Sequence, residues 1–127
     1  MKINSLHCPV TNALTVLGGK WKINIIFLLS NKTMRFGAIK NTLQGITQQM
    51  LSKQLKELER DKLIIRTVHD TVPLKVTYEL TDLGKSSIPV LNSMYEWGIK
   101  QQSKLSKTYI SSSTYKRYSW APSSMFY

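Results

Sequence analysis

The hydrophobic period changes once within residues 35–66, and this change limits the folds open to the chain. Apolar residues first recur at helical spacing in two stretches: Phe36, Ile39 and Leu43, then Met50, Leu51, Leu55 and Leu58. The turn LQGIT joins the stretches, with Gly45 as a helix stop and Thr47 as an N-cap. After Leu63, LIIRTVHD and KVTYELT are β-branched and partly alternating, which predicts a two-stranded hairpin with its loop near residues 70–75.

The same spacing predicts helices on both sides of this segment. Residues 10–17 and 20–31 form two, separated by Gly18-Gly19, and residues 81–104 form a third, capped by Thr81 or Asp82. Pro89 predicts a kink or a late start in that last helix. Two short helices joined by a tight turn and followed by a hairpin are a winged helix-turn-helix. We therefore expect an α+β, mostly α fold with terminal helices.

Charge indicates the kind of partner. The 127 residues carry 18 basic and 7 acidic side chains, a net charge of +11, and no acid precedes Glu57. Residues 1–100 alone give 14 − 7 = +7, so the basic character does not depend on the tail. Such an excess predicts a polyanionic partner, nucleic acid or less often an anionic membrane surface. We expect a DNA-binding domain over residues 1–102 and a mobile Ser/Tyr-rich basic tail over residues 103–127.

The outer face of the helix after Thr47 suits base recognition. Gln49, Lys53, Lys56 and Arg60 lie opposite the leucines, with Gln48 and Ser52 beside them. Glutamine can bond bidentately to adenine, lysine can donate to guanine, and serine serves a base edge or a phosphate. A solvated helix face is the ordinary alternative. The predicted DNA contacts are Thr47, Gln48, Gln49, Ser52, Lys53 and Lys56, with Lys32, Arg35 and Lys75 as phosphate contacts.

Several strings resemble one family. They are CPV at 8–10, LGGKWKINIIFLL at 17–29, RFGAIKNTLQGITQQMLSKQLKELERDKLIIR at 35–66, VPLKVTYELTDLG at 72–84 and YEWG at 95–98. In this order they resemble the HxlR-type winged helix-turn-helix transcriptional regulators of bacteria, in the MarR-like superfamily. The resemblance covers roughly residues 6–100 and says nothing about the tail.

The resemblance implies a homodimer on a near-palindromic operator in double-stranded DNA. The helices around residues 10–17 and 82–100 then pair across a two-fold axis, and the two recognition helices enter successive major grooves. The residues expected at the dimer interface are Leu14, Leu17, Leu91, Met94, Tyr95 and Trp97. The resemblance also implies that residues 47–53 read the bases and that residues 70–75 form the wing.

Cys8 is the single cysteine, so no intrachain disulfide can form, and a reducing cytoplasm is expected. Some members of the family sense electrophiles or oxidants through a cysteine near the amino terminus, and Cys8 occupies that position. The resemblance thus makes Cys8 a candidate redox sensor. The alternative is a small buried residue that anchors the amino-terminal arm.

The sequence gives little support for an enzyme, a metal-binding protein or a membrane protein. The two histidines, His7 and His69, have no evident catalytic partner or metal-ligand cluster, and the chain has no glycine-rich phosphate loop. We expect no enzyme, no metal and no cofactor. The longest apolar run, INIIFLL, is too short to span a bilayer, and no signal peptide is recognised. A cytoplasmic protein without a membrane partner follows.

Two alternatives stay open. The fold could serve a small-molecule-sensing or protein-interaction module without operator specificity, with Met94, Tyr95 and Trp97 lining a pocket between subunits. The tail could bind a membrane surface or RNA by alternating aromatic and basic residues: Tyr109, Tyr115, Lys116, Arg117, Tyr118 and Trp120.

Overall fold

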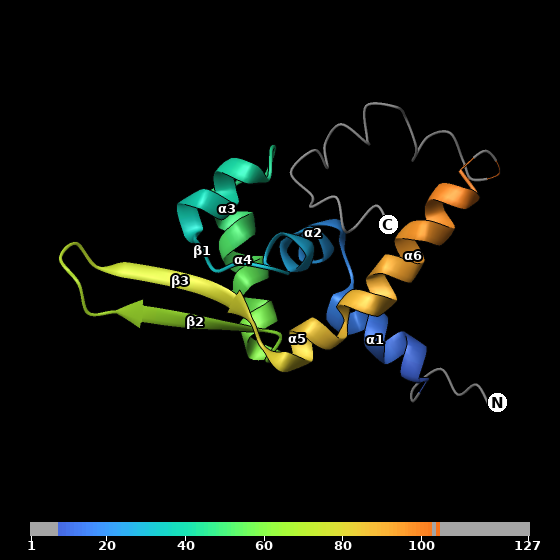
Figure 1. Cartoon of the computed structure of the whole chain (residues 1–127), viewed down its shortest axis with the longest axis horizontal. Coiled ribbons are helices and arrows are strands. Elements are labelled where there is room, and N and C mark those ends of the chain that lie inside the picture. The colour runs from blue at the N-terminus through green and yellow to red at the C-terminus, as the bar shows by residue number, and fades with distance from the viewer. Residues whose placement is uncertain (1–7, 103, 105–127) are drawn as a thin grey trace.

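A computed structural model describes residues 8–102 and residue 104. Its elements are, in order, α1 (Pro9–Leu17), α2 (Lys20–Leu28), β1 (Met34–Arg35), α3 (Phe36–Thr42), α4 (Gln48–Arg60), β2 (Ile64–His69), β3 (Lys75–Leu80), α5 (Asp82–Ser86) and α6 (Ile88–Lys100) (Figure 1). Apart from Lys104, the predicted tail over residues 103–127 lies outside the described residues. The winged helix-turn-helix prediction is confirmed, with α3 and α4 as the two joined helices and β2–β3 as the wing.

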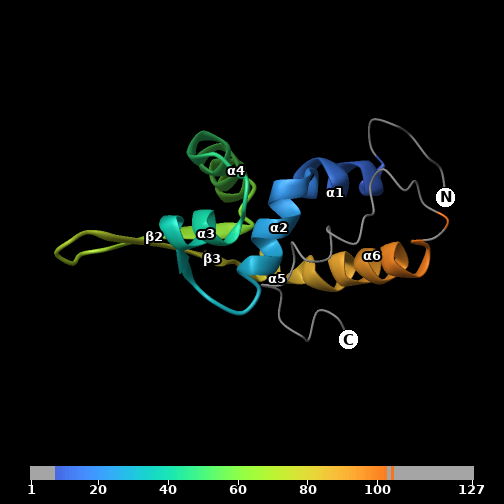
Figure 2. The same ribbon diagram turned by 90° about the horizontal axis from the view of Figure 1, so that it is seen from above.

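Helix α2 lies at the centre of the molecule (Figures 1 and 2). Ile25, Ile26, Phe27 and Leu28 are all buried, and so is Lys22. Nearly the whole circumference of this helix is covered, as its apolar sequence predicts. The largest fully buried side chains come from α2, α3, α4 and β2: Ile25, Ile26, Ile39, Leu51, Leu58 and Ile64. These residues form one core under the helix-turn-helix.

The sheet has three antiparallel strands in the order β1-β3-β2. The predicted hairpin is confirmed, with Ile64 opposite Leu80 and His69 opposite Lys75. The third strand, β1, is not among the predicted elements: Met34 and Arg35 pair with Tyr78 and Thr77 of β3. A strand of two residues is too short to display alternating hydrophobicity, so no local pattern predicts it. The strand holds the start of α3 against the wing.

The turn between α4 and β2 fixes where the wing begins. Lys62 has a positive φ of 63°, an uncommon value for a residue with a side chain. The amide of Leu63 donates to the carbonyl of Leu58 at 2.9 Å, and that of Lys62 to Glu59 at 3.0 Å. These two bonds are a Schellman ending, which satisfies the last carbonyls of the helix. The Thr81 hydroxyl also donates to the Lys62 carbonyl at 2.6 Å, tying this turn to α5.

The predicted last helix is two helices, α5 and α6. The Thr81 cap is confirmed, since its side chain accepts from the amide of Gly84 at 3.0 Å. Helix α6 begins at Ile88 with Pro89 in its first turn, where the missing amide hydrogen breaks no helical bond. The late start that Pro89 predicts is therefore confirmed. In both views α1 and α6 lie at the end of the molecule opposite the wing (Figures 1 and 2).

Candidate nucleic-acid interface

Helix α4 begins in a well-defined turn. Gly45 has φ 91°, which favours glycine, and the buried Ile46 anchors the turn to the core. The predicted cap is confirmed, because the Thr47 hydroxyl accepts from the amide of Met50 at 3.1 Å. The remaining amides of the first turn have no partner within the helix and point out of its amino-terminal end. This end attracts negative charge.

The inner face of α4 is formed by leucines, as predicted. Leu51, Leu55 and Leu58 are at most 2% exposed. The prediction that Met50 belongs to this stripe is wrong, because its side chain is 37% exposed. Met50 lies at the edge of the stripe, where its sulfur is 3.3 Å from Nε2 of Gln54. Helical spacing alone does not separate an edge position from a central one.

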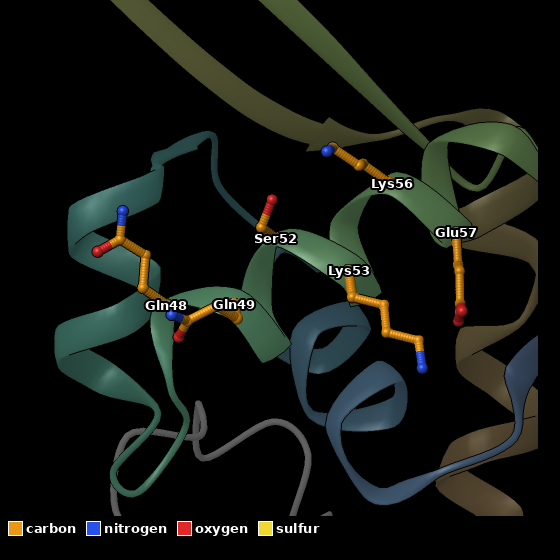
Figure 3. Close-up of a pocket in the computed structure, with 6 residues that line it drawn as sticks. All are labelled: Gln48, Gln49, Ser52, Lys53, Lys56 and Glu57. Atoms are coloured by element: carbon orange, nitrogen blue, oxygen red, sulfur yellow. The ribbon is translucent and has the colours of Figure 1, made fainter.

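The outer face of α4 forms an open hollow. Six residues line it: Gln48, Gln49, Ser52, Lys53, Lys56 and Glu57. Figure 3 shows the two glutamines at the amino-terminal end, Ser52 and Lys56 on the side of the hairpin, and Lys53 and Glu57 on the side of α2. Five of these residues are predicted DNA contacts. The structure thus brings the predicted reading residues onto one surface, with amides and a hydroxyl first and ammonium groups after them.

Glu57 is the lining residue that the sequence did not single out. Its Oε2 is 2.8 Å from Nζ of Lys22 on α2. The hydrogen bond from Lys22 holds the pKa of the Glu57 carboxyl below its usual range, and the charges of Lys22, Lys53 and Arg60 act in the same direction. The carboxylate is therefore ionised near neutral pH and balanced by a buried ammonium group.

The predicted phosphate contacts lie apart from this hollow. Lys32 is exposed in the loop before β1, where it lines a second cleft with Lys85 and Glu79. Arg35 is exposed on β1, and Lys75 begins β3 at the base of the wing loop. Each therefore belongs to a different segment of the chain, outside α4. The sequence did not predict that Lys85 lies in this cleft, because no local pattern places its helix beside Lys32.

The predicted dimer residues divide by burial. Leu14, Met94 and Trp97 are 53%, 48% and 60% exposed, whereas Leu91 is 3% exposed and packs in the core of its own chain. Leu17 and Tyr95 are half-buried. Other exposed apolar residues lie on the same helices or on α5 and were not predicted: Val10, Leu83 and Val90. The terminal helices thus carry a large apolar surface.

Cys8 is the partly exposed residue that precedes α1. The backbone amide of Thr11, then that of Val10, and the Thr11 side chain lower the pKa of the Cys8 thiol. A lower pKa raises the fraction of nucleophilic thiolate. The alternative of a small buried residue that anchors the amino-terminal arm fits this partial exposure less well.

The histidine and the other possible metal ligands of the described residues form no metal-binding cluster. His69 lies on the wing with its Nε2 2.8 Å from Oγ1 of Thr77, and His7 is outside the described part. Within residues 8–102 and 104, no three His, Cys, Asp or Glu side chains gather as metal ligands. None of the helices in that part is both long and apolar enough to cross a membrane.

Comparison with known proteins gives a consistent result. Residues 16–106 match the model of the family described as HxlR-like helix-turn-helix. The uncharacterized HTH-type transcriptional regulator YdzF of Bacillus subtilis is 45% identical over 98 residues, which are 76% of this chain and 90% of YdzF. The redox regulator HypR in its reduced form has a TM-score of 0.71 and 39% identity, covering 75% of this chain and 94% of HypR. The reduced form of the transcriptional regulator YodB of Bacillus subtilis has a TM-score of 0.67 and 36% identity, covering 72% and 91%.

Proposed function

This chain belongs to the HxlR-like helix-turn-helix family, and from that premise we propose that it reads a near-palindromic DNA operator as a homodimer. It is a DNA-binding transcription regulator with a winged helix-turn-helix fold.

The outer face of α4 carries the proposal. Gln48, Gln49, Ser52 and Lys53 project from the first two turns of the helix that follows the tight turn, on the side opposite its buried leucines. Amide and ammonium groups at this position match the donor and acceptor pattern of base edges in the major groove. Lys56, with Lys32, Arg35 and Lys75 on surrounding elements, serves the phosphate backbone and fixes the position of the protein on the duplex.

The exposed apolar residues of α1 and α6 support dimerisation. Leu14, Met94 and Trp97 are too apolar to be left in water together at one end of a small protein. Pairing this end across a two-fold axis places the two α4 helices on the same side of the assembly. Each then enters a major groove one helical turn from the other, about 34–36 Å away.

Selection of bound fragments from fragmented genomic DNA tests the reading proposal. The expected product is an inverted repeat with half-sites one helical turn apart, about 10–10.5 base pairs from centre to centre. A bound pool with no shared sequence contradicts operator specificity and favours a winged-helix module of another function.

Sedimentation velocity tests the dimer. Trp97→Glu places a charge in the proposed interface and should yield a monomer, whereas the wild type sediments as a dimer. Val72→Glu is the matched control, because Val72 is a fully exposed apolar residue at the wing tip, far from α6. A monomeric wild type, or equal effects of both substitutions, contradicts the interface.

Cys8 is the proposed sensor of oxidants or electrophiles. Its lowered thiol pKa and its partial exposure support this role, and HypR, a redox regulator by name, has a similar fold. The test compares operator affinity of wild type and Cys8→Ser before and after diamide with a small thiol, or a quinone. Sensing predicts a change in the wild type that the serine variant lacks. An unchanged wild type, or the same response in both proteins, contradicts the role.

An apolar hollow favours a second candidate function, the sensing of a small apolar molecule. It lies between α1 and α5, and its lining includes Val16, Leu17, Leu63 and Leu83. A thermal-shift screen of apolar compounds, read beside a footprinting assay, separates the candidates. Ligand-stabilised protein that protects no DNA site favours the sensing module, and a protected inverted repeat favours the operator reader.

A further inference from the structure

Lys22 is a buried lysine on α2, at the edge of the core. Lys22 is 7% exposed, and its Nζ lies 2.8 Å from Oε2 of Glu57 on α4. Lysine is among the residues least often buried, and a buried charge requires a partner. This ion pair therefore occupies a place where an apolar contact would serve the core at least as well.

The pair differs in kind from the other contacts of α4. Leu51, Leu55 and Leu58 hold the helix by apolar contacts, which are non-directional. In the described part of the chain, the other polar side-chain contacts of α4 stay within the helix or at its caps. The Lys22–Glu57 bond is directional and joins α4 to α2. It thus adds a directional constraint on the rotation of α4 about its own axis to the apolar packing of the leucines.

Glu57 also belongs to the hollow on the outer face. It is the one carboxylate among the six lining residues, and it lies one turn after Lys53. Figure 3 shows its side chain on the side of α2. A carboxylate turned instead toward the reading residues would repel the DNA backbone. Lys22 both balances this charge and holds it at the edge of the hollow.

We propose that Lys22 is a positioning residue for DNA recognition: through Glu57 it sets the rotation of α4 that presents Gln49 and Ser52 to base edges. The inference rests on the proposed function, because it concerns how α4 reads DNA. Lys22 itself lies beneath α4 and touches no base. Its loss alters the preference for the operator over other DNA, and a small rotation is sufficient because base contacts require close geometry.

Three variants test this role. Lys22→Met removes the ammonium group and keeps an apolar side chain of similar length. The Glu57 side chain, which loses its partner, is 27% exposed in the wild type and can be hydrated. Lys22→Met/Glu57→Met removes both charges, which protects folding from an unpaired charge. Lys20→Met is the matched control, because Lys20 is an exposed lysine on the same helix and lies over the Trp21 ring. Each is measured by fluorescence anisotropy on the selected operator fragment and on a scrambled duplex of equal length and composition.

The positioning role predicts that Lys22→Met weakens operator binding about tenfold and scrambled binding less than about threefold. The double variant should unfold near the wild-type temperature and still lack the preference, and Lys20→Met should keep it. Without DNA, the amide ¹H–¹⁵N shifts of residues 48–53 should move in the single and double variants and stay in place in the control.

A purely structural role gives a different result. The affinities of Lys22→Met for both duplexes then fall in the same proportion, and the double variant has the wild-type preference; either observation overturns the inference. Unchanged amide shifts overturn it as well. A wild type that binds both duplexes equally refutes the proposed function itself. A wild type with a clear preference that Lys22→Met retains refutes only the positioning role.

Discussion

The carbonyl oxygen of Leu63 lies directly against Gly84, where a side chain would overlap it. The same carbonyl accepts from the amide of Thr81 at 3.0 Å. Leu63 follows α4 and begins the connection to the wing, whereas Gly84 lies in α5 and leads to α6. Close approach at this point thus connects the helix that we propose for DNA reading to the terminal helices that we propose for dimerisation.

Gly84→Ala should destabilise the fold. The added methyl group meets the Leu63 backbone, which cannot move without shifting the start of β2, so we expect a loss of about 1–3 kcal/mol in the free energy of unfolding. Urea denaturation measures the loss. Gly37→Ala in α3 is the control, since nothing lies within 4 Å of the new methyl group, and it should gain about 0.5–1 kcal/mol. Equal effects of the two substitutions would disprove the close contact.

Thr47→Ala should remove the cap of α4. The hydroxyl that accepts from the Met50 amide is lost, at an expected cost of about 1 kcal/mol in unfolding free energy. Thr47→Ser keeps the hydroxyl and should retain most of the stability. Thermal unfolding of the three proteins compares them. If serine and alanine destabilise equally, the methyl group rather than the hydroxyl is the important part of Thr47.

Stability should fall with acid more steeply in the wild type than in Lys22→Met. Lys22 lowers the pKa of Glu57 in the folded protein. The pKa of a glutamate in the unfolded chain is about 4.3. The pair therefore stabilises the folded state above that pH, and this contribution is lost as pH falls through the lowered folded-state pKa. Unfolding free energies measured between about pH 6 and about pH 3 give the two slopes. Parallel curves would mean that Lys22 does not set the Glu57 titration.

DNA binding should depend steeply on salt. If each subunit contacts about four phosphates, the slope of log K against log salt is roughly −7 for the dimer. Lys75→Ala removes one contact per subunit and should make the slope shallower by about 2. Lys100→Ala is the control, because Lys100 is exposed at the end of α6 away from the wing. A wild-type slope near zero contradicts the electrostatic part of the proposal.

Local signals made much of the fold predictable from the sequence. The Thr47 and Thr81 caps and the break near Pro89 depend on residues close in sequence, and the structure has all three. The leucine stripe and the hairpin have clear periods of their own. These features are also the ones that place the candidate reading residues on one helix face.

The features that were missed depend on contacts distant in sequence. Lys22 and Glu57 are 57 − 22 = 35 positions apart in the sequence, and nothing local to either residue indicates the pair. Strand β1 exists because β3 offers an edge to Met34 and Arg35. Leu91 is buried because it joins a core cluster whose other members come from distant parts of the chain. Spacing shows which residues share a face, but not what the face packs against.

Gln49→Ala tests the central proposal, that the outer face of α4 reads bases. The measurement is the ratio of operator affinity to scrambled-duplex affinity, with Lys75→Ala as the phosphate-contact control. We predict that Gln49→Ala weakens operator binding by about 1–3 kcal/mol and leaves scrambled binding nearly unchanged, so that the ratio falls. Lys75→Ala should weaken both duplexes alike and preserve the ratio. Equal losses on both duplexes for Gln49→Ala would contradict the account.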